Sequence, residues 1–258
     1  MPEPILVSRD GAIATVTLNN PDRLNALNKA MWAGLGRTMR QLSAEDEIRC
    51  IVVRGAGDKF AAGADIAEFA NERADAKQAK EYGRIIHETM QAVARCRHPT
   101  VAMIKGACVG GGLEIAAMCD LRVAGASSRF GIPVNRLGLT MAYGELMGLL
   151  ALVGRAVALE ILLEGRVFDA DEAYRKGLVT RVVPNDKVEE EAYATAHRIA
   201  EGAPLVNHWH KQFIYRLAVA AELTPQEWDE GFECFDTDDY REGVAAFLAK
   251  RKPDFRGR

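Results

Sequence analysis

The chain has 258 residues, of which 48% are hydrophobic and 27% charged, and its formal net charge is −3. This length is enough for one large domain, or for one domain with an appendage. The balanced charge excludes nucleic-acid binding as the main role.

The five cysteines have no paired spacing and indicate buried thiols in a reducing compartment. The first residues do not resemble a signal peptide, and no apolar run approaches the roughly 18 residues of a membrane span. We therefore expect a cytoplasmic protein that contacts no membrane.

The first part of the chain predicts a hairpin, two helices and a buried strand. Asp10-Gly11 lies between two runs of alternating apolar residues, which is a hairpin signal. The spacing of apolar residues predicts a helix over 25–42, a strand over 50–53 and a helix over 78–97. Residues 60–65 (FAAGAD) form a loop of small residues directly after that strand. Its simplest interpretation is a plain turn in which Asp65 caps the helix that follows.

The stretch from Ile104 to Asp120 is the one that indicates chemistry. A short apolar run typical of a buried strand ends at Ile104, and three consecutive glycines, 110–112, precede an apolar helical pattern. Glycines at such a junction let a ligand lie against bare main chain. The first turn of the helix offers unpaired N–H groups and a positive dipole end. Glu114 lies in that turn, and a carboxylate beside such donors suits a proton transfer next to a carbonyl.

A purely structural interpretation of this stretch also stays open. Glycine turns before helices are common, and a first-turn glutamate is favourable for the helix dipole alone. No Gly-Lys-Ser/Thr follows, so the stretch is not a P-loop, and Ile115 stands where a Rossmann turn needs its third glycine. Elsewhere, His208 and His210 would point to different faces of a helix, which argues against a metal site.

The alternation of strands and helices continues to residue 183 and then gives way to helices. Expected elements are a strand over 121–124, a loop from 130, a helix over 147–163 interrupted at 154–155, a helix over 169–176 and a strand over 178–183. Helical patterns then fill 186–201, 205–221, 225–235 and 239–251. The alternation predicts the α/β class. A helical tail with little core of its own predicts an oligomer.

Five motifs, in this order, resemble the crotonase (enoyl-CoA hydratase/isomerase) superfamily over nearly the whole chain. They are residues 25–27 (NAL), 60–66 (FAAGADI), 110–114 (GGGLE), 130–133 (FGIP) and 247–252 (FLAKRK). The resemblance implies a spiral of ββα units over residues 1–195 and a C-terminal helical oligomerisation domain over 196–258. It also implies a homotrimer, or a hexamer built as a dimer of trimers, with an acyl-CoA thioester as substrate and no separate cofactor or metal.

The same resemblance implies roles for individual residues. The backbone N–H groups of Ala64 and Gly111 would hold the thioester oxygen, and Glu114 would be the catalytic acid/base. Arg23 would lie near the phosphates of coenzyme A, and the tail residues would meet its nucleotide across a subunit boundary. The substrate-binding positions that carry over are Arg23, Ala26, Ala62, Asp65, Ile66, Val134, Phe247 and Lys250.

One position departs from the pattern of the hydratases. These carry a second glutamate after the proline of Phe-Gly-x-Pro, where this chain has Val134. Adding water across a double bond needs both a base and an acid. Tyr143 and Glu145 fall where they could reach the acyl pocket, although an ordinary helix start with a dipole-friendly acid is the favoured interpretation of both. We therefore expect an enoyl-CoA hydratase of fatty-acid or related metabolism first. An isomerase, an acyl-CoA decarboxylase and a non-catalytic acyl-CoA binder stay open.

Overall fold

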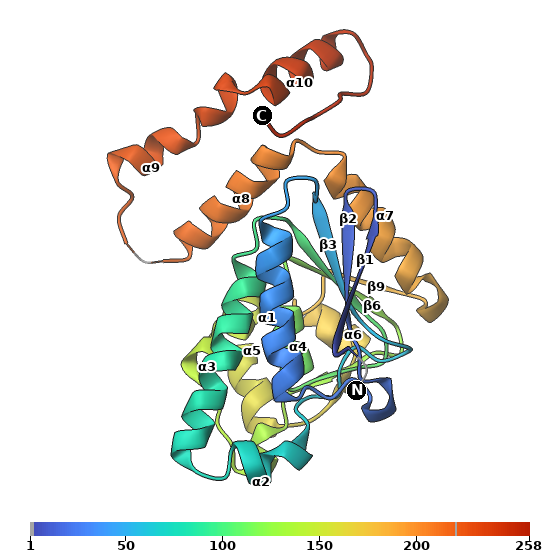
Figure 1. The fold of residues 1–258 in the computed structure, drawn as a ribbon, viewed down its shortest axis with the longest axis vertical. Helices are drawn as coiled ribbons and strands as arrows, with labels where there is room; N and C mark the ends of the chain where they lie inside the picture. Colours follow the sequence, from blue (N-terminus) through green and yellow to red (C-terminus); the bar gives the residue numbers. More distant parts are fainter. Residues whose placement is uncertain (1–2, 220) are drawn as a thin grey trace.

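The computed structural model describes residues 3–219 and 221–258. Its largest sheet has six strands in the order β1-β2-β3-β4-β6-β9 (Figure 1). β1 and β2 are antiparallel, and every other neighbouring pair is parallel. The strands are β1 (Ile5–Asp10), β2 (Ile13–Leu18), β3 (Cys50–Gly55), β4 (Thr100–Ile104), β6 (Leu121–Gly125) and β9 (Arg181–Val183).

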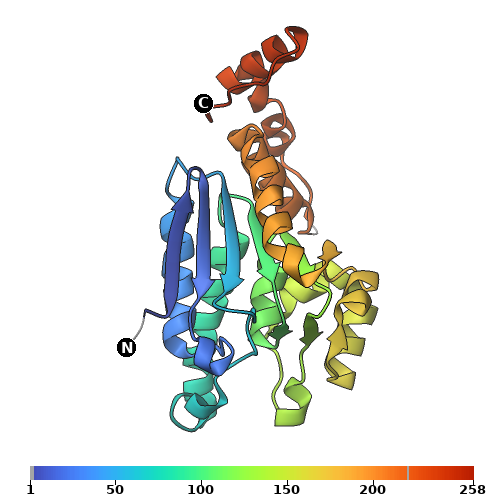
Figure 2. The ribbon, with the colours of Figure 1, turned by 90° about the vertical axis from the view of Figure 1, so that its right-hand side faces the viewer.

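Helices cover both faces of this sheet (Figure 2), and alternate residues of its strands pack against these two helix layers. On one face Val53 and Ala102 join the large core formed with α1 and α3. On the other face Val52 and Val101 pack against α7. Since successive side chains of a strand point to opposite faces, both faces of these parallel strands are apolar. The layers are α1 (Lys29–Ser43), α3 (Ala76–Ala94) and α7 (Val188–Ala200).

A second, three-stranded sheet, the long helix α5 and several short helices complete the first part of the fold. In this sheet β5 is parallel to β7, and β7 is antiparallel to β8. Its strands have only two or three residues, too few for a periodic pattern to reveal. The elements are β5 (Ala107–Val109), β7 (Arg129–Gly131), β8 (Phe168–Asp169), α2 (Phe69–Glu72), α4 (Gly111–Met118), α5 (Tyr143–Glu164), α6 (Ala170–Arg175), and the 3₁₀ turns η1 (Pro21–Arg23), η2 (Ile66–Glu68), η3 (Val134–Leu137) and η4 (Asn185–Lys187).

The loops after β3 and β4 meet because neighbouring parallel strands end at the same edge of a sheet. The N–H of Ala61 donates to the carbonyl of Ala107 at 2.9 Å, and the N–H of Val109 donates to the carbonyl of Ala61 at 3.0 Å. Asn25 ties a third loop to them: its buried Nδ2 donates to the carbonyls of Ala56 (2.9 Å) and Lys59 (2.8 Å). Three segments that are distant in sequence are therefore fixed side by side.

Most of the predicted elements are present, with shifted ends. The hairpin around Asp10-Gly11 is confirmed. The helix predicted from residue 25 begins at Lys29 instead, because Asn25 has φ +57° and Asn28 caps the helix by accepting the N–H of Met31 at 2.8 Å. The predicted interruption at Gly154 is confirmed, since that residue has φ 69° and ψ 175° within α5.

The C-terminal helices extend away from the sheets, as Figures 1 and 2 show. They are α8 (Pro204–Leu217), α9 (Pro225–Glu230), the 3₁₀ turn η5 (Glu233–Asp236) and α10 (Asp238–Leu248). Lys211 on α8 anchors them through an ion pair to Asp120, at 2.8 Å. The boundary predicted between residues 195 and 196 falls inside α7, which packs on the sheet as far as Ala200.

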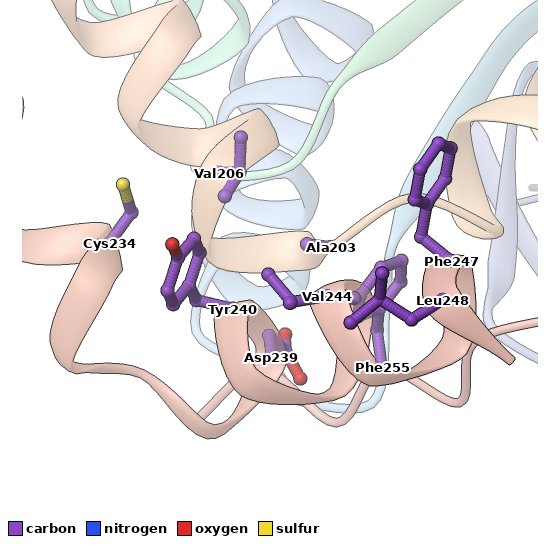
Figure 3. A pocket seen from close by; sticks show the side chains of 10 residues that line it. Ala203, Val206, Cys234, Asp239, Tyr240, Val244, Phe247, Leu248 and Phe255 are labelled. Carbon is purple, nitrogen blue, oxygen red and sulfur yellow. The ribbon is translucent and has the colours of Figure 1, made fainter.

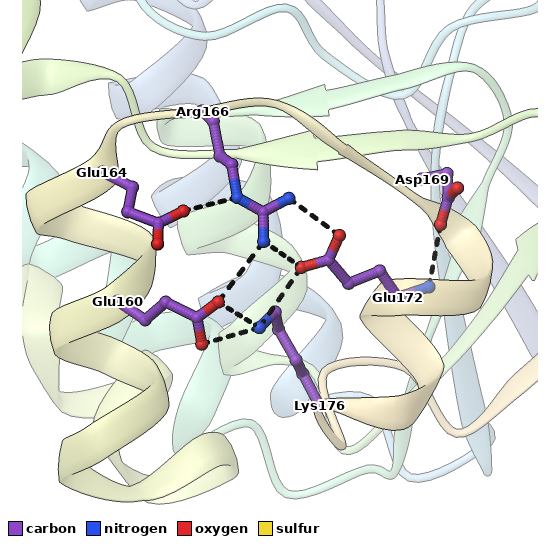
Figure 4. Close-up of polar contacts among 6 residues, drawn as sticks. All are labelled: Glu160, Glu164, Arg166, Asp169, Glu172 and Lys176. Atoms are coloured by element: carbon purple, nitrogen blue, oxygen red, sulfur yellow. Dashed lines mark hydrogen bonds and ion pairs between the residues drawn. The ribbon is translucent and has the colours of Figure 1, made fainter.

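A network of charged side chains joins the end of α5 to α6 (Figure 4). Arg166 bonds to Glu160, Glu164 and Glu172, and Lys176 donates to Glu160 at 2.7 Å. The hydrogen bond from Arg166 lowers the pKa of Glu172 to about 2. The network therefore holds the turn that carries β8 in place at neutral pH.

By length and apolar composition alone, α5 could cross a membrane, and it is the one helix of the described residues with this property. The sequence analysis overlooked it because charged residues interrupt the run. In the structure α5 packs against α4, where Gly148 lies close to Met118. A membrane role has no further support from these contacts.

Candidate active site

Two glycines bring two backbone N–H groups to the same place. Gly63 has φ +110° and Gly110 has φ +51°, conformations that favour glycine. The two residues touch, since a Cβ built on Gly110 would lie 3.5 Å from the Cα of Gly63. Ala64 and Gly111 follow them directly, and neither N–H has a backbone acceptor among the described residues. The site therefore presents two neighbouring donors to a ligand.

The packing around these donors requires small residues. A Cβ on Gly112 would come within 2.5 Å of the carbonyl oxygen of Ala61, which is backbone and cannot move aside. A Cβ on Gly111 would lie 2.9 Å from side-chain carbons of Leu27 and Trp32. Main chain thus forms the floor of the site, and the buried side chains packed against it fix its position.

Glu114 lies in the first turn of α4, beside these donors. Its side chain is only 8% exposed, and its carboxyl oxygens have no hydrogen-bond partner among the described residues. Burial, and secondly the charge of Glu145, raises the pKa of Glu114 to about 8. Glu114 therefore keeps its proton at neutral pH and can give it to a reacting carbon.

A cavity of about 200 Å³ opens over the two donors and Glu114. Ala62, Ile66 and Val134, which the sequence analysis named, also line it. Apolar side chains close its walls, and Arg73 and Glu145 add a guanidinium group and a second carboxyl group. The apolar wall residues are Trp32, Phe69, Ile86, Val109, Pro133, Leu137, Leu139 and Met141.

Comparisons with known proteins show the family of the chain. Residues 8–258 match the family model "Enoyl-CoA hydratase/isomerase". The chain belongs to that family. A "Probable enoyl-CoA hydratase" of Mycobacterium tuberculosis is 37% identical over 98% of both chains. The short-chain-enoyl-CoA hydratase of Clostridium acetobutylicum is 33% identical over 96% of this chain and 95% of its own.

Solved structures confirm the fold. An enoyl-CoA hydratase/carnithine racemase from Magnetospirillum magneticum superposes with a TM-score of 0.97, is 52% identical, and covers 99% of this chain and 96% of its own. The crotonase-like α/β architecture predicted from the five motifs is therefore confirmed, as is the prediction that the protein is an enzyme of the enoyl-CoA hydratase/isomerase family.

Some residues predicted to bind substrate lie outside this enzyme's cavity. Arg23 forms an ion pair with Asp65 at 2.8 Å, and Asp65 caps η2 by accepting the N–H of Ala67 at 3.2 Å. The pair lies beside the cavity, directly after Ala64. Ala26 is half-buried in the neighbouring loop, where its carbonyl accepts a hydrogen bond from Asn20.

Phe247 and Lys250 lie farther away, in and just after α10 at the opposite end of the chain from α2 and α3 (Figure 1). Within a single subunit, these two residues do not reach the cavity. Their predicted contact with the nucleotide across a subunit boundary stays a prediction.

A larger cavity, of about 390 Å³, lies between α8 and α10 (Figure 3). Its walls are apolar side chains such as Val206, Val244 and Phe255. The one carboxylate in the wall, Asp239, accepts the N–H groups of Arg256 (2.7 Å) and Gly257 (2.9 Å). Cys234 and Tyr240 also line this cavity, but it contains neither Glu114 nor the two N–H donors, so we assign the chemistry to the smaller one.

Sequence reasoning missed one charged group of the site, Arg73, and favoured a structural interpretation of a second, Glu145. Arg73 follows α2 and lies over the rings of Phe69 (4.6 Å) and Tyr82 (5.2 Å). No short-range pattern in the sequence indicates that this arginine reaches the cavity. Glu145 is 9% exposed and lines the cavity, whereas Tyr143 is 92% exposed. The sequence pattern at Glu145 is an acidic residue in the first turn of a helix. This pattern is ambiguous because exposed helix caps have the same sequence pattern.

Proposed function

We propose that this enzyme adds water to 2-enoyl-CoA thioesters by way of an enolate. The N–H groups of Ala64 and Gly111 hold the thioester oxygen as negative charge develops on it, and Glu114 transfers the proton at the α carbon. Two donors without backbone acceptors, placed side by side over a buried carboxyl group, are the observation that carries this proposal.

The hydratase assignment has support from the named relatives, and the cavity is consistent with it. The Clostridium relative is named a short-chain-enoyl-CoA hydratase. A cavity of about 200 Å³ with apolar walls suits a small acyl group rather than a long chain. Coenzyme A itself would remain outside, near the Arg23–Asp65 pair.

Val134 supports a second candidate, an enoyl-CoA isomerase. Moving a double bond needs one carboxylate that takes a proton and returns it nearby, and the ionised form of Glu114 suffices for that. Decarboxylation, the third candidate, would rely chiefly on the two N–H donors.

Two substrates separate these activities in one assay. The enzyme is mixed with crotonyl-CoA and with a 3-enoyl-CoA, and the absorbance of the 2-enoyl thioester is followed. Loss of absorbance from crotonyl-CoA indicates hydration, and a gain from the 3-enoyl ester indicates isomerisation. No change with either ester, together with measurable binding of acetyl-CoA, would contradict both assignments.

We also propose that the chain works as a homotrimer, or a hexamer of two trimers, in the cytoplasm. Large apolar side chains on the C-terminal helices remain exposed in one chain, among them Phe247 (83%), Leu248 (76%) and Trp228 (67%). Contact with another copy would cover them. Light scattering on the purified protein tests the assembly, and a monomeric mass would contradict it.

A further inference from the structure

Two carboxyl groups share the cavity, although the residue after Pro133 is a valine. Glu114 comes from α4 and Glu145 from the first turn of α5, and both line the cavity. Their side chains are 8% and 9% exposed. Val134 lines the same cavity but offers no polar atom. The position of a second carboxyl group has therefore changed, while its presence in the cavity has not.

The oxygens of these groups are available to a ligand. One oxygen of Glu145, Oε2, accepts the N–H of Ala142 at 2.7 Å, and the other has no partner among the described residues. Among the described residues, only two side-chain nitrogen or oxygen atoms are both shielded from solvent and without a hydrogen-bond partner: Trp32 Nε1 and His98 Nε2. The free oxygens of Glu114 and Glu145 are therefore open to the cavity rather than enclosed in protein.

Helix capping alone does not account for Glu145. Another glutamate, Glu227, occupies the same third position of its helix, α9, and donors of Thr224 and Arg216 surround it. Its side chain is 22% exposed and it is ion-paired. Glu145 is more deeply buried, has one hydrogen bond and has no ion pair among the described residues. Burying a carboxylate in this way has a cost that an exposed cap avoids.

The charges around the pair allow one proton to be shared. Arg73 is the one cation among the lining residues, and it has no ion-pair partner in the described part of the chain. From α3, His87 packs against Gly144, and Tyr82 lies under Arg73. One positive charge balances one of the two carboxylates, so the other is expected to be protonated.

Environment decides which of the two keeps the proton. Burial raises the pKa of both groups, but the N–H of Ala142 favours the ionised form of Glu145 and opposes its shift. Glu114 has no such donor. The hydrogen bond from Ala142 therefore favours ionisation of Glu145, and Glu114 is the one expected to keep the proton, which gives a base and an acid on one substrate.

We propose that Glu145 is the second catalytic carboxylate of this enzyme and does the work that Val134 cannot do. This inference rests on the proposed hydration of enoyl thioesters. Glu145 removes a proton from water while the water oxygen bonds to the β carbon. The π electrons move toward the thioester oxygen, which the N–H groups of Ala64 and Gly111 hold. As the enolate collapses, the α carbon takes the proton of Glu114, and the proton on Glu145 then passes to Glu114 and restores the starting state.

The test compares Glu145→Gln with a matched capping variant, Glu227→Gln, in the full-length protein. The glutamine can still accept the N–H of Ala142, so the helix keeps its cap. We expect Glu145→Gln to lower kcat for crotonyl-CoA hydration by at least about 100-fold, and Glu227→Gln to leave it unchanged. Equal hydration rates in wild type and folded Glu145→Gln would overturn the inference.

Two further readouts separate chemistry from a structural role. Exchange of the α protons of butyryl-CoA in D₂O needs only Glu114 and the N–H donors. It should persist in Glu145→Gln, because loss of the neighbouring charge lowers the pKa of Glu114, so that a larger fraction of Glu114 is ionised and can accept a proton at neutral pH. A second variant, Val134→Glu in the Glu145→Gln background, should regain part of the hydration rate. Loss of hydration and exchange together, with no recovery, would overturn the inference.

The same assays distinguish a failure of the proposed function from a failure of the role proposed for Glu145. If the wild-type enzyme neither hydrates 2-enoyl-CoA esters of four, six and ten carbons nor exchanges α protons, the proposed function fails and the role of Glu145 with it. If the wild type hydrates and Glu145→Gln hydrates equally well, only the role of Glu145 fails.

Discussion

Replacing Gly111 by proline tests the donor role of its N–H directly. Gly111 is the first residue of α4, whose first internal hydrogen bond runs from the N–H of Glu114 to the carbonyl of Gly110 at 3.0 Å. The N–H of Gly111 has no part in that ladder, and proline is well tolerated at the first position of a helix. The substitution therefore removes a donor from the site without removing a hydrogen bond from the helix.

The effect of losing the N–H of Gly111 must be separated from the effect of the added side-chain atoms. Any side chain at 111 brings a Cβ within 2.9 Å of carbons of Leu27 and Trp32. Gly111→Ala carries that same crowding and keeps the N–H, so it is the control. One oxyanion donor contributes about 2.7–4 kcal/mol to transition-state stabilisation. At about 1.36 kcal/mol per tenfold change, Gly111→Pro should have a kcat/KM about 100- to 1000-fold below that of Gly111→Ala.

The assay is the loss of 2-enoyl absorbance with crotonyl-CoA, measured for both variants. Circular dichroism checks that each variant is folded. Binding of free coenzyme A, which lacks the thioester oxygen, should have the same Kd in both. Equal kcat/KM values in two folded variants would refute the assignment of this N–H.

Three other outcomes follow from the same structure. Glu114→Gln should lower kcat by about 100- to 10,000-fold with the Kd of acetyl-CoA unchanged in calorimetry, and full activity would place the acid/base elsewhere. Burial raises the pKa of Glu114 and Arg73 opposes that shift, so Arg73→Met should move the alkaline limb of the hydration rate to higher pH; an unmoved or lowered limb would contradict this charge balance. Lys211→Met breaks the ion pair with Asp120 and should lower the free energy of unfolding in urea by about 1–3 kcal/mol, whereas Lys187→Met, at the exposed pair with Glu190, should leave the midpoint unchanged.

The sequence predicted the features of this enzyme that depend on local pattern. The hairpin at Asp10-Gly11 and the break at Gly154 are confirmed. Both could be predicted because glycine adopts a positive φ readily and other residues rarely do. The glycine run at the start of α4 indicated bare main chain, and a Cβ on Gly111 or Gly112 would indeed come within 2.9 Å of neighbouring atoms. The start of α1 was misplaced because the side chain of Asn25 bonds to carbonyls more than 30 positions away, and such a contact leaves no periodic signal.

What the sequence could not predict depends on burial and on tertiary contacts. A first-turn glutamate is an ion-paired cap with a 22% exposed side chain in α9 and a buried group of the cavity in α5, and only packing distinguishes the two. Arg73 lines the cavity with its guanidinium group packed on the aromatic rings of Phe69 and Tyr82, which is a tertiary contact. The strands β5, β7 and β8 are too short for a periodic signal, and the bridge from Ala61 to Cys108 of β5 is a tertiary contact.

A crystal structure of the enzyme with acetyl-CoA bound would test the central claim most directly. We predict that the thioester oxygen lies about 2.7–3.1 Å from the backbone nitrogens of both Ala64 and Gly111, with the α carbon facing Glu114. A thioester oxygen bound anywhere else, with these two N–H groups left to solvent, would contradict the account.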